Sequence, residues 1–288
     1  MAKILKGAPV AEALSIDLMV RCAYLRSKEI IPKLAILRVG EKPADIAYEK
    51  GAMKRCTKIG VDVECISLPE DASNRQVLDA IHRINQDKKI HGCLMFRPFK
   101  DKETEAEACR LLDPKKDVDC ITTGALGDVF VGKENGFAPC TAQACMEMLK
   151  YYGYDIKGKR VTVVGTSLVI GKPLAVMLVN SSGTVTMCHI DTVNTEEHCR
   201  NAEILVSATG VAGLIDSNYV SPEQIILDVG INKNKDGDLC GDVDFEAVEP
   251  IVEAISPVPG GVGTVTSTVL VKHVIEAAEQ EIFLSAKV

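Results

Sequence analysis

The stretch that decides the fold is VTVVGTSLVIGKPLA (161–175). An apolar run breaks at Gly165, passes through two hydroxyl-bearing residues and reaches Gly171 and Pro173 before it becomes apolar again. A buried strand, a tight turn and a helix with proline in its first turn give this pattern. The stretch therefore predicts a strand, a loop and a helix whose N-terminus can face a phosphate group.

The loop does not fit a phosphate-transfer P-loop. The Walker A pattern needs four residues between its glycines and Ser or Thr after the lysine. Here five residues separate Gly165 from Gly171, and Pro173 follows Lys172. The dinucleotide pattern G-x-G-x-x-G is also incomplete, since Ser167 stands at its second glycine, but strand, turn and helix follow in the order that a dinucleotide site requires. An ordinary strand-to-helix turn is the alternative.

An acidic residue often follows such a loop by about 20 positions and binds the adenosine ribose. Asp191 comes directly after the apolar segment TVTMCHI (184–190) and occupies that place. A carboxylate repels the 2'-phosphate of NADP, so the sequence predicts a preference for NAD. The alternative for Asp191 is a solvated loop charge.

Strand and helix patterns alternate on both sides of this loop. Residues 32–40, 61–68 and 90–96 read as buried strands, each followed by a helix, over 44–59, 74–84 and 102–112. A helix over 141–151 precedes four further strand candidates, RVTVVG, TVTMCHI, EILVSAT and IILDVGI. The pattern predicts an α/β protein with two doubly wound domains, the second of them Rossmann-like.

The segment DPKKDVDCITTGALGDVFVGKENGFAPC (113–140) interrupts the alternation and reads as a long loop. We place the domain boundary at its end. The first domain is predicted to comprise residues 1–140, completed by a C-terminal helix over 265–288, and the second, dinucleotide-binding domain residues 141–264.

Composition excludes several classes of protein. The chain has 288 residues, of which 47% are hydrophobic and 25% charged, the balance of a soluble globular protein. Its net charge of -7 gives no general reason to bind nucleic acid or an anionic membrane. No segment approaches the roughly 18 apolar residues of a membrane span, and we expect a cytoplasmic protein. Eleven cysteines without a C-x-x-C pair indicate reduced, mostly buried thiols and no metal site.

Several ordered motifs resemble one family. The segments GTSLVIGKP, TVTMCHIDT, SATG, DVGIN, GDVDF and PVPGGVGT are similar to the cofactor domain of methylenetetrahydrofolate dehydrogenase/cyclohydrolase. PKLAILRVGEKPADIAY, KKDVD and FAPCT resemble the folate-side segments of that family, in the same order. The resemblance covers nearly the whole chain.

The resemblance implies a homodimeric enzyme of one-carbon metabolism with folate in a cleft between the domains. Its dehydrogenase step passes hydride from methylenetetrahydrofolate to a nicotinamide, and its cyclohydrolase step adds water to the methenyl product. The cofactor supplies the hydride chemistry, so the protein must align two ring systems.

The resemblance also assigns roles to residues. Tyr48 is expected to stack near the pterin and Asp119 to pair with its amino and ring nitrogens. The folate cleft would be lined by the loop with Pro259, Gly260, Gly261, Gly263 and Thr266. The dinucleotide contacts implied are Thr141, Gly165, Thr166, Ser167, Gly171, Ile190, Asp191 and Ile231. Taken singly, each has a plain structural alternative: a partly buried aromatic, a solvated carboxylate or a simple turn.

The sequence departs from the family at the position of its catalytic lysine. The family motif is Y-x-x-x-K, and Ala52 stands where the lysine is expected. Lys50 and Lys54 lie about 160° and 120° around the helix from Tyr48, away from its face. Phe96 replaces the glutamine that orients the lysine in the family. Loss of both partners makes cyclohydrolase activity doubtful, although a displaced lysine remains an alternative.

Other departures lie near the two sites. Thr166 stands where many members have arginine, and Ile190 with Asp191 where a polar pair often meets the 2'-phosphate; these favour NAD. Cys120 replaces glycine and Thr264 replaces proline. The leading hypothesis is an NAD-preferring methylenetetrahydrofolate dehydrogenase. The alternatives are the usual bifunctional enzyme and a folate- or nucleotide-binding or regulatory protein without catalysis.

Overall fold

The structure is a computed structural model and describes residues 1–133 and 136–285. The chain forms two compact units. Unit 1 contains Met1–Glu12 and Thr141–Thr266, and unit 2 contains Ala13–Cys140 and the chain from Ser267 onward. The sequence-based division placed residues 1–12 in the first domain, whereas here they belong with the dinucleotide-binding segment, because strand β1 (Lys3–Ile4) pairs in parallel with β11 (Ala254–Ile255).

Unit 1 is built on a parallel sheet of six strands in the order β1-β11-β8-β7-β5-β6. The strands of the predicted Rossmann-like part are β5 (Arg160–Val164), β6 (Thr184–Cys188), β7 (Ile204–Ser207) and β8 (Ile225–Asp228). Strand β5 lies between β6 and β7, so the chain leaves β5 in one direction and returns on its other side. Ligands of open α/β sheets bind at such a switch point, at the carboxyl ends of the strands.

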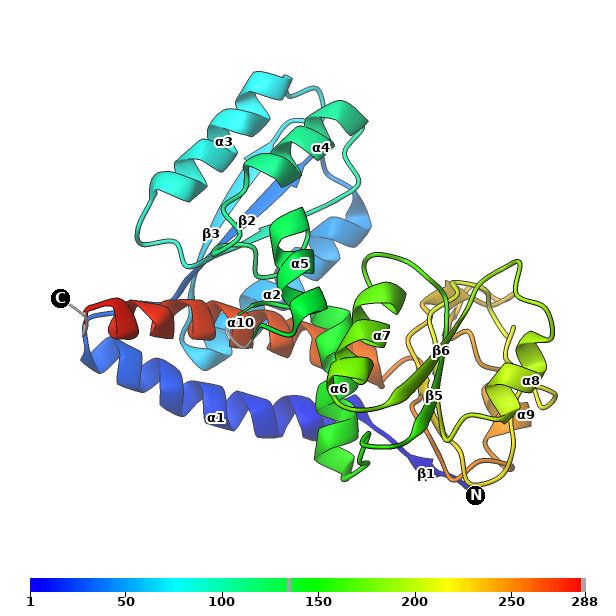
Figure 1. The fold of residues 1–288 in the computed structure, drawn as a ribbon. Coiled ribbons are helices and arrows are strands. Elements are labelled where there is room, and N and C mark those ends of the chain that lie inside the picture. The colour runs from blue at the N-terminus through cyan, green and yellow to red at the C-terminus, as the bar shows by residue number, and fades with distance from the viewer. Residues whose placement is uncertain (134–135, 286–288) are drawn as a thin grey trace. The chain divides into compact units, whose positions relative to one another are not determined.

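The helices of unit 1 connect these strands. They are α6 (Cys140–Tyr152), α7 (Gly171–Asn180), α8 (Thr195–Arg200) and α9 (Phe245–Val248). A short antiparallel hairpin of β9 (Asn232–Lys233) and β10 (Leu239–Cys240) follows β8. Apolar residues of the six-stranded sheet, such as Val164, Leu205 and Ile226, are buried in the core of unit 1, as expected for a sheet covered on both faces. Figure 1 labels β5, β6 and the helices around them.

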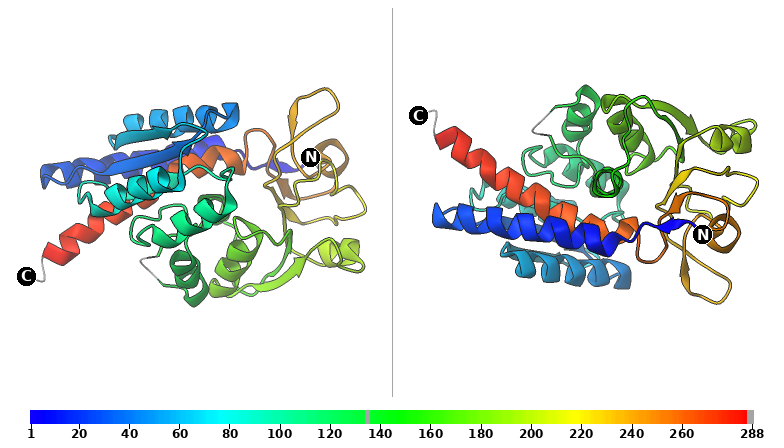
Figure 2. Two further views of the ribbon diagram at one scale, coloured as in Figure 1. Left: turned by 90° about the horizontal axis from the view of Figure 1, so that it is seen from above. Right: turned by 90° about the horizontal axis from the view of Figure 1, so that it is seen from below.

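Unit 2 has a parallel sheet of three strands in the order β3-β2-β4. Strand β2 (Lys33–Val39) is central, with β3 (Asp62–Leu68) and β4 (Gly92–Met95) beside it. Helices α3 (Asn74–Gln86) and α4 (Lys102–Leu111) bury one face of the sheet in a common core. Helix α2 (Pro43–Ile59) covers the opposite face (Figure 2). Strand β2 therefore has one neighbour on each side, which makes its carboxyl end a second switch point. Ligands of open α/β sheets bind at such a point.

Two of the boundaries between the units fall inside long helices. Helix α1 (Gly7–Ser27) and helix α10 (Val262–Ser285) each run from one unit into the other. Within unit 2 they are joined by Arg21, whose guanidinium donates to both carboxylate oxygens of Glu279 at 2.8 and 2.7 Å. Fork-shaped pairing of this kind is the stronger form of ion pair.

Two sequence predictions need correction. The segment 113–140 is not one loop, because helix α5 occupies Thr123–Val131. The Thr122 hydroxyl accepts the Ala125 N–H at 3.1 Å, and Gly132 ends the helix with a left-handed φ of 67°. The final helix begins at Val262, three residues earlier than expected. Helix α1 and strands β1 and β11 were not predicted.

All eleven cysteines are free, and most are buried. No helix in the described part of the chain is long and apolar enough to cross a membrane. Within residues 1–133 and 136–285, no three His, Cys, Asp or Glu side chains are grouped to hold a metal ion.

Candidate functional site

Helix α2 presents Tyr48 at the carboxyl edge of the unit 2 sheet. Pro43 occupies its first turn, and Gly60 ends it with φ 100°, so the helix runs without interruption past both positions of interest. Tyr48 is 38% exposed, and Ala52, one turn later on the same face, is completely buried. Lys50 and Lys54 are exposed. Ala52, where the family resemblance predicts a lysine, is therefore an interior position, and Lys50 and Lys54 lie on the solvent side.

The Phe96 ring contacts the Tyr48 ring edge to face. The ring centroids are 5.8 Å apart, and the planes are inclined by 85°. Phe96 directly follows β4 and therefore lies at the carboxyl edge of the sheet, as Tyr48 does. An edge-to-face pair is a favourable aromatic geometry. Tyr48 and Phe96, which the sequence singled out in two separate segments, are thus in contact.

Asp119 comes two residues after a point where the chain pairs with β4. The Cys93 N–H donates to the Lys116 carbonyl at 2.7 Å, and Cys93 forms a parallel bridge with Asp117. Asp117 therefore lies beside β4, and Asp119 lies in the turn that follows this bridge.

The carboxylate of Asp119 is half-buried and sparsely paired. Desolvation raises its pKa above the usual range, and hydrogen bonds from the Cys140 thiol and N–H offset this in part. The Cys140 N–H lies 3.4 Å from Oδ1. The positive charge of Arg97 also lowers this pKa, although less. A carboxylate with unused acceptor positions in a recess is suited to a ligand that brings its own donors.

Arg97 was not among the predicted site residues. It is half-buried and directly follows Phe96 in the segment MFRPFK. A basic residue just after a buried strand end was the signal that could have indicated it.

The Tyr48 hydroxyl belongs to the same cluster. Desolvation, followed by the charges of Cys140 and Asp119, raises the pKa of Tyr48 well above its usual value. The hydroxyl therefore stays protonated and can donate or accept a hydrogen bond. Tyr48, Phe96 and Asp119, which the sequence singled out separately, lie in one region of unit 2.

The other aspartate of KKDVD has a structural role. Asp117 is completely buried, and its carboxylate accepts the N–H groups of Ile121 and Thr122 at 3.0 and 2.7 Å. Cys120 between them adopts a left-handed φ of 57°, a conformation that glycine reaches at less cost. This backbone conformation explains why glycine suits the position that Cys120 occupies here.

The glycine loop of unit 1 connects β5 with α7 through a tight turn. Gly165 has φ 114°, and a Cβ atom there would collide with the Ala208 carbonyl. A Cβ atom on Gly171 would collide with the Gly165 carbonyl, so the two ends of the loop touch. The Ser167 hydroxyl accepts the Ile170 N–H at 3.2 Å. Thr166 lies between Gly165 and Ser167, which brings four predicted cofactor contacts into one loop before the α7 N-terminus.

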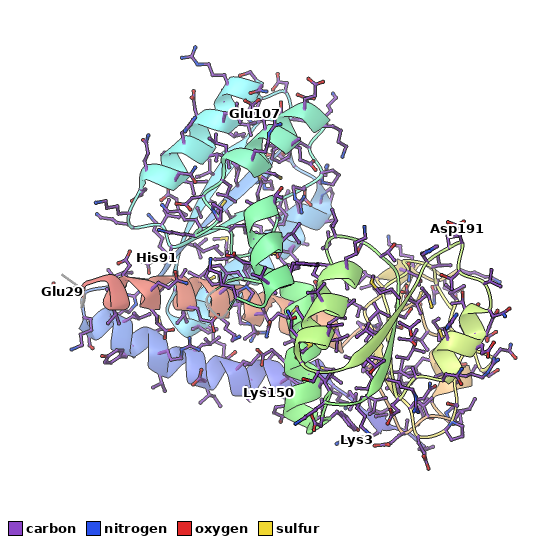
Figure 3. All side chains as sticks on the ribbon, viewed as in Figure 1. Lys3, Glu29, His91, Glu107, Lys150 and Asp191 are labelled. Atoms are coloured by element: carbon purple, nitrogen blue, oxygen red, sulfur yellow. The ribbon has the colours of Figure 1, made fainter. Side chains whose placement is uncertain are left out.

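Ile190 and Asp191 follow β6, the neighbour of β5. Gly165 N–H donates to the Cys188 carbonyl at 2.9 Å, which ties the start of the loop to the end of β6. Ile190 is 98% exposed, and the Asp191 carboxylate projects into solvent with His189 Nδ1 3.7 Å away (Figure 3). Both side chains are accessible to a ligand at this edge. Ile231, after β8, is 70% exposed.

A buried pair of aspartates at this edge was missed. Asp242 accepts from the Ser207 hydroxyl at 3.0 Å, the Thr209 N–H at 2.6 Å and the Asn232 amide at 2.8 Å. Asp228 accepts the N–H groups of Gly230, Asp242 and Val243 at 3.0, 3.0 and 2.9 Å. The pair ties together the loops after β7 and β8. An aspartate at the end of an apolar strand in DVGIN, and a second in GDVDF, were the available signals.

The loop with Pro259 packs on the start of α1 within unit 1. The Gly7 N–H donates to the Gly260 carbonyl at 2.8 Å, and Gly260 has φ 103°. A Cβ atom on Gly7 would collide with the Gly261 carbonyl. Gly263 has open space around its Cα, and the buried Thr266 is one turn into α10. Thr264, where the family has proline, donates its N–H to the Gly261 carbonyl at 3.0 Å. Thr141 lies in the first turn of α6.

Comparison with known proteins matches both halves of the chain to one family. Residues 5–119 match the family model described as tetrahydrofolate dehydrogenase/cyclohydrolase, catalytic domain. Residues 139–282 match the NAD(P)-binding domain of the same description. These ranges contain Tyr48, Ala52, Phe96 and Asp119 in the first and the glycine loop with Asp191 in the second.

Individual relatives agree over almost their full length. A protein of Carboxydothermus hydrogenoformans named "Bifunctional protein FolD" is 48% identical over 281 residues, which is 97% of this chain and 98% of that protein. The crystal structure of bifunctional FolD from Campylobacter jejuni, a methylenetetrahydrofolate dehydrogenase/cyclohydrolase, superposes with a TM-score of 0.94 at 33% identity, covering 98% and 100% of the two chains. A 5,10-methylenetetrahydrofolate dehydrogenase of the silkworm Bombyx mori gives 0.91 at 33% identity, covering 98% and 99%.

Proposed function

The chain belongs to the tetrahydrofolate dehydrogenase/cyclohydrolase family, and on that premise we propose that it oxidises 5,10-methylenetetrahydrofolate to 5,10-methenyltetrahydrofolate with a nicotinamide dinucleotide. The observation that carries the proposal is the sparsely paired carboxylate of Asp119 beside Tyr48, in a chain that also has the glycine loop of a dinucleotide site.

The folate is assigned to Asp119 and Tyr48. The 2-amino group and a ring nitrogen of a pterin are adjacent donors, which a carboxylate can accept together. The Tyr48 ring, held edge-on by Phe96, offers a flat apolar surface to the bicyclic system. We assign the Pro259, Gly260, Gly261, Gly263 and Thr266 loop to the same substrate, because Gly263 leaves room for close approach of a ligand to the backbone.

The dinucleotide is assigned to the loop between β5 and α7. The collisions that a side chain would cause at Gly165 and Gly171 show a turn tight enough for the α7 N-terminus to follow immediately, and such an end attracts a pyrophosphate. We assign Thr141, Thr166, Ser167 and Ile231 to contacts with the same cofactor. When bound, the nicotinamide accepts the hydride. The chain's own task is to orient the two ligands.

NAD is the proposed cofactor, rather than NADP. The Asp191 side chain is exposed and carries a negative charge at the position where the adenosine ribose is expected. A 2'-phosphate there would be repelled, and Ile190 offers it no hydrogen bond.

The cyclohydrolase step is proposed to be absent. Hydrolysis in the family depends on a lysine at the position of Ala52, and Ala52 is fully buried beside the exposed Lys50 and Lys54. Phe96 replaces the orienting glutamine with a ring that packs on Tyr48. The double variant Ala52→Lys with Phe96→Gln should gain enzyme-accelerated hydrolysis of the methenyl product. A correctly folded double variant without any gain would contradict the assignment of these two positions.

A homodimer is proposed on the basis of an exposed apolar stripe on α1. Ile16, Val20 and Tyr24 are spaced four residues apart and are 56%, 68% and 55% exposed. A stripe of this kind is typical of an interface, and a second copy of the chain would cover it. Val20→Glu should shift the mass in solution from dimer to monomer. A wild-type mass of one chain would contradict the proposal.

The reaction is tested by adding methylenetetrahydrofolate to the purified chain with NAD or NADP and measuring the initial rate of dinucleotide reduction. We expect reduction with both and a higher kcat/KM with NAD. Folate binding without reduction of either dinucleotide would support a binding protein and overturn the proposed reaction.

A further inference from the structure

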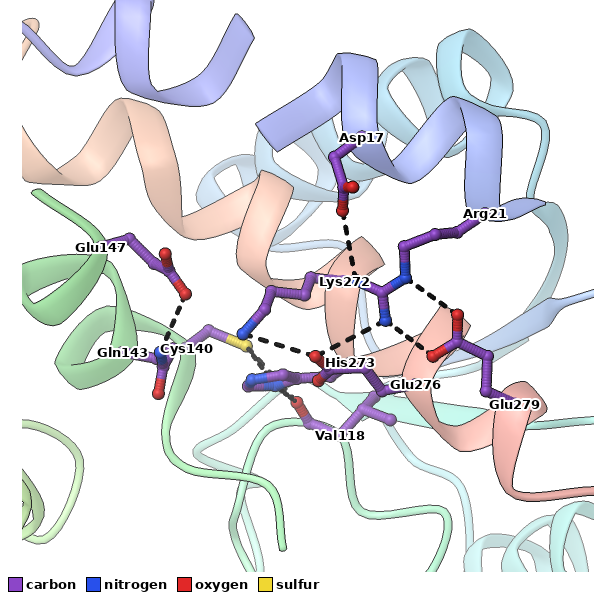
Figure 4. A network of polar contacts seen from close by, with 10 residues as sticks. All are labelled: Asp17, Arg21, Val118, Cys140, Gln143, Glu147, Lys272, His273, Glu276 and Glu279. Atoms are coloured by element: carbon purple, nitrogen blue, oxygen red, sulfur yellow. Dashed lines mark hydrogen bonds and ion pairs between the residues drawn. The ribbon is translucent and has the colours of Figure 1, made fainter. Parts of the chain in front are cut away.

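Two side chains converge on the carbonyl oxygen of Val118, the residue before Asp119. His273 Nδ1 lies 2.9 Å from this oxygen, and Cys140 Sγ lies 3.4 Å from it (Figure 4). A carbonyl oxygen only accepts, so Nδ1 carries the ring proton and donates it. The oxygen has two lone pairs and can receive both donors.

Both donors are held in place and keep their protons. His273 is 3% exposed on α10, and its ring stacks at a tilt on Phe137, with centroids 5.3 Å apart. Burial, followed by the charge of Asp119, raises the pKa of the Cys140 thiol well above its usual value. The thiol therefore stays protonated, and its single proton is shared between the Val118 carbonyl and the Asp119 carboxylate.

The Val118 carbonyl belongs to the peptide group that joins Val118 to Asp119. Because a peptide group is planar, fixing its oxygen fixes the plane from which the Asp119 backbone continues. The Val118 side chain is wedged against Gly92, where a Cβ atom would lie 2.6 Å from Cγ1. The carboxylate itself has only the hydrogen bonds from Cys140 among the interactions found in the described chain. Its direction thus depends on the backbone behind it.

We propose that His273 is a positioning residue for Asp119: its Nδ1–H holds the Val118 carbonyl, and this aims the carboxylate at the pterin nitrogens. The inference rests on the proposed folate site and adds to it a residue that does not touch the substrate. It requires that the affinity for the folate depends on the hydrogen bond rather than on the bulk of the ring.

Two nearly isosteric substitutions separate the hydrogen bond from the packing. In His273→Asn, the amide nitrogen is bonded to Cγ, as Nδ1 is in histidine, and can still donate to Val118. His273→Leu has a similar shape and no donor. We expect KM for methylenetetrahydrofolate to rise about tenfold in His273→Leu and to stay within about twofold of wild type in His273→Asn, with KM for NAD unchanged in both.

Ile275→Ala is the matched control. Ile275 is buried on the same helix and has no polar group, so its truncation loosens α10 without removing a donor. KM for the folate should remain near the wild-type value in this variant. Equal rises in the Asn and Leu variants, a rise in Ile275→Ala as large as in His273→Leu, or no rise in any variant would each overturn the inference.

Equilibrium binding of tetrahydrofolate to the same four proteins keeps this test separate from the proposed reaction. If the wild-type chain binds tetrahydrofolate but does not reduce a dinucleotide, the proposed reaction fails, and the Kd values still test His273. We expect Kd to follow the same order as KM. No binding to the wild-type chain would overturn both.

Discussion

Asp119 in unit 2 and Asp242 in unit 1 both lie near the carboxyl edge of a parallel sheet, but their surroundings differ. Asp242 is completely buried and accepts from Ser207, Thr209 and Asn232. Asp119 is half-buried and has its hydrogen bonds from Cys140 alone within the described residues. A carboxylate that accepts hydrogen bonds from three different segments of its own chain holds loops together, whereas one with few such partners can bind a ligand.

The largest expected effect is on activity, in Asp119→Asn. The amide cannot accept two donors as a carboxylate does, and its NH₂ group would face the pterin amino group. Hydrogen bonds to a charged group contribute about 1.5–3 kcal/mol each, so kcat/KM for the folate should fall about 10²–10³-fold. Initial rates at saturating NAD measure this.

The same substitution should leave stability nearly unchanged. Desolvation already disfavours the charged form of Asp119, as the raised pKa indicates. The urea midpoint of Asp119→Asn should therefore stay at or slightly above that of wild type. A large fall in the midpoint with activity retained would show that Asp119 is structural, and the contrast with Asp242 would fail.

Asp242→Asn is the converse experiment and has the next largest effect. The NH₂ group of an asparagine at this position would face the donors of Ser207, Thr209 or Asn232. Because two donors cannot bond to each other, at least one of them would be buried without an acceptor. The free energy of unfolding should fall by about 2–4 kcal/mol. Denaturant unfolding followed by circular dichroism measures it. Unchanged stability would mean that the loops after β7 and β8 do not depend on this carboxylate.

Asp228 should make stability depend on pH. Burial, partly offset by three backbone N–H donors, raises its pKa from 3.8 to about 6. The folded chain then holds a proton that the unfolded chain releases, so this contribution to stability is complete below pH 3.8 and is lost as pH rises through about 6.

The Asp228→Asn variant isolates that contribution. The difference in unfolding free energy between wild type and Asp228→Asn should change by up to about 3 kcal/mol across this range of pH and stay constant above it. A difference that does not vary between pH 4 and 7 would show that Asp228 titrates as an ordinary carboxylate.

The smallest effect on stability is expected for Asp191→Ser. The Asp191 side chain is more exposed than those of Asp119 and Asp242. Removing the exposed charge should change the unfolding free energy by less than about 0.5 kcal/mol. The ratio of kcat/KM for NAD to that for NADP should fall about tenfold, because the repulsion of the 2'-phosphate is lost. An unchanged ratio would show that Asp191 does not face the ribose.

The sequence predicted the α/β units well because each buried parallel strand is a short apolar run with a glycine or polar residue after it, as in PKLAILRVG. It did not predict β1 and β11, since two-residue strands carry no periodic signal and their paired residues, such as Lys3 and Ala254, lie 251 positions apart. It also missed α5, because the composition of TTGALGDVF favours a loop, and Thr122 and Gly132 act as helix caps only in that register.

Site residues were predictable to the extent that local motifs name them. Tyr48, Phe96 and Asp119 each stand in a recognisable segment, and the structure brings them together. The partnership of Asp228 with Asp242 and that of His273 with Val118 join positions 14 and 155 residues apart. Such pairings depend on sheet register and helix packing, which no single segment contains.

The most direct test of the account follows the methenyl product after it forms. Purified wild-type chain is given methylenetetrahydrofolate and NAD, and the ultraviolet absorbance of methenyltetrahydrofolate is recorded until it has decayed. The account predicts NAD-dependent accumulation, followed by decay at the rate of an enzyme-free solution. Failure to form the product with either dinucleotide would contradict the dehydrogenase, and decay accelerated by the protein would contradict the loss of hydrolysis at Ala52 and Phe96.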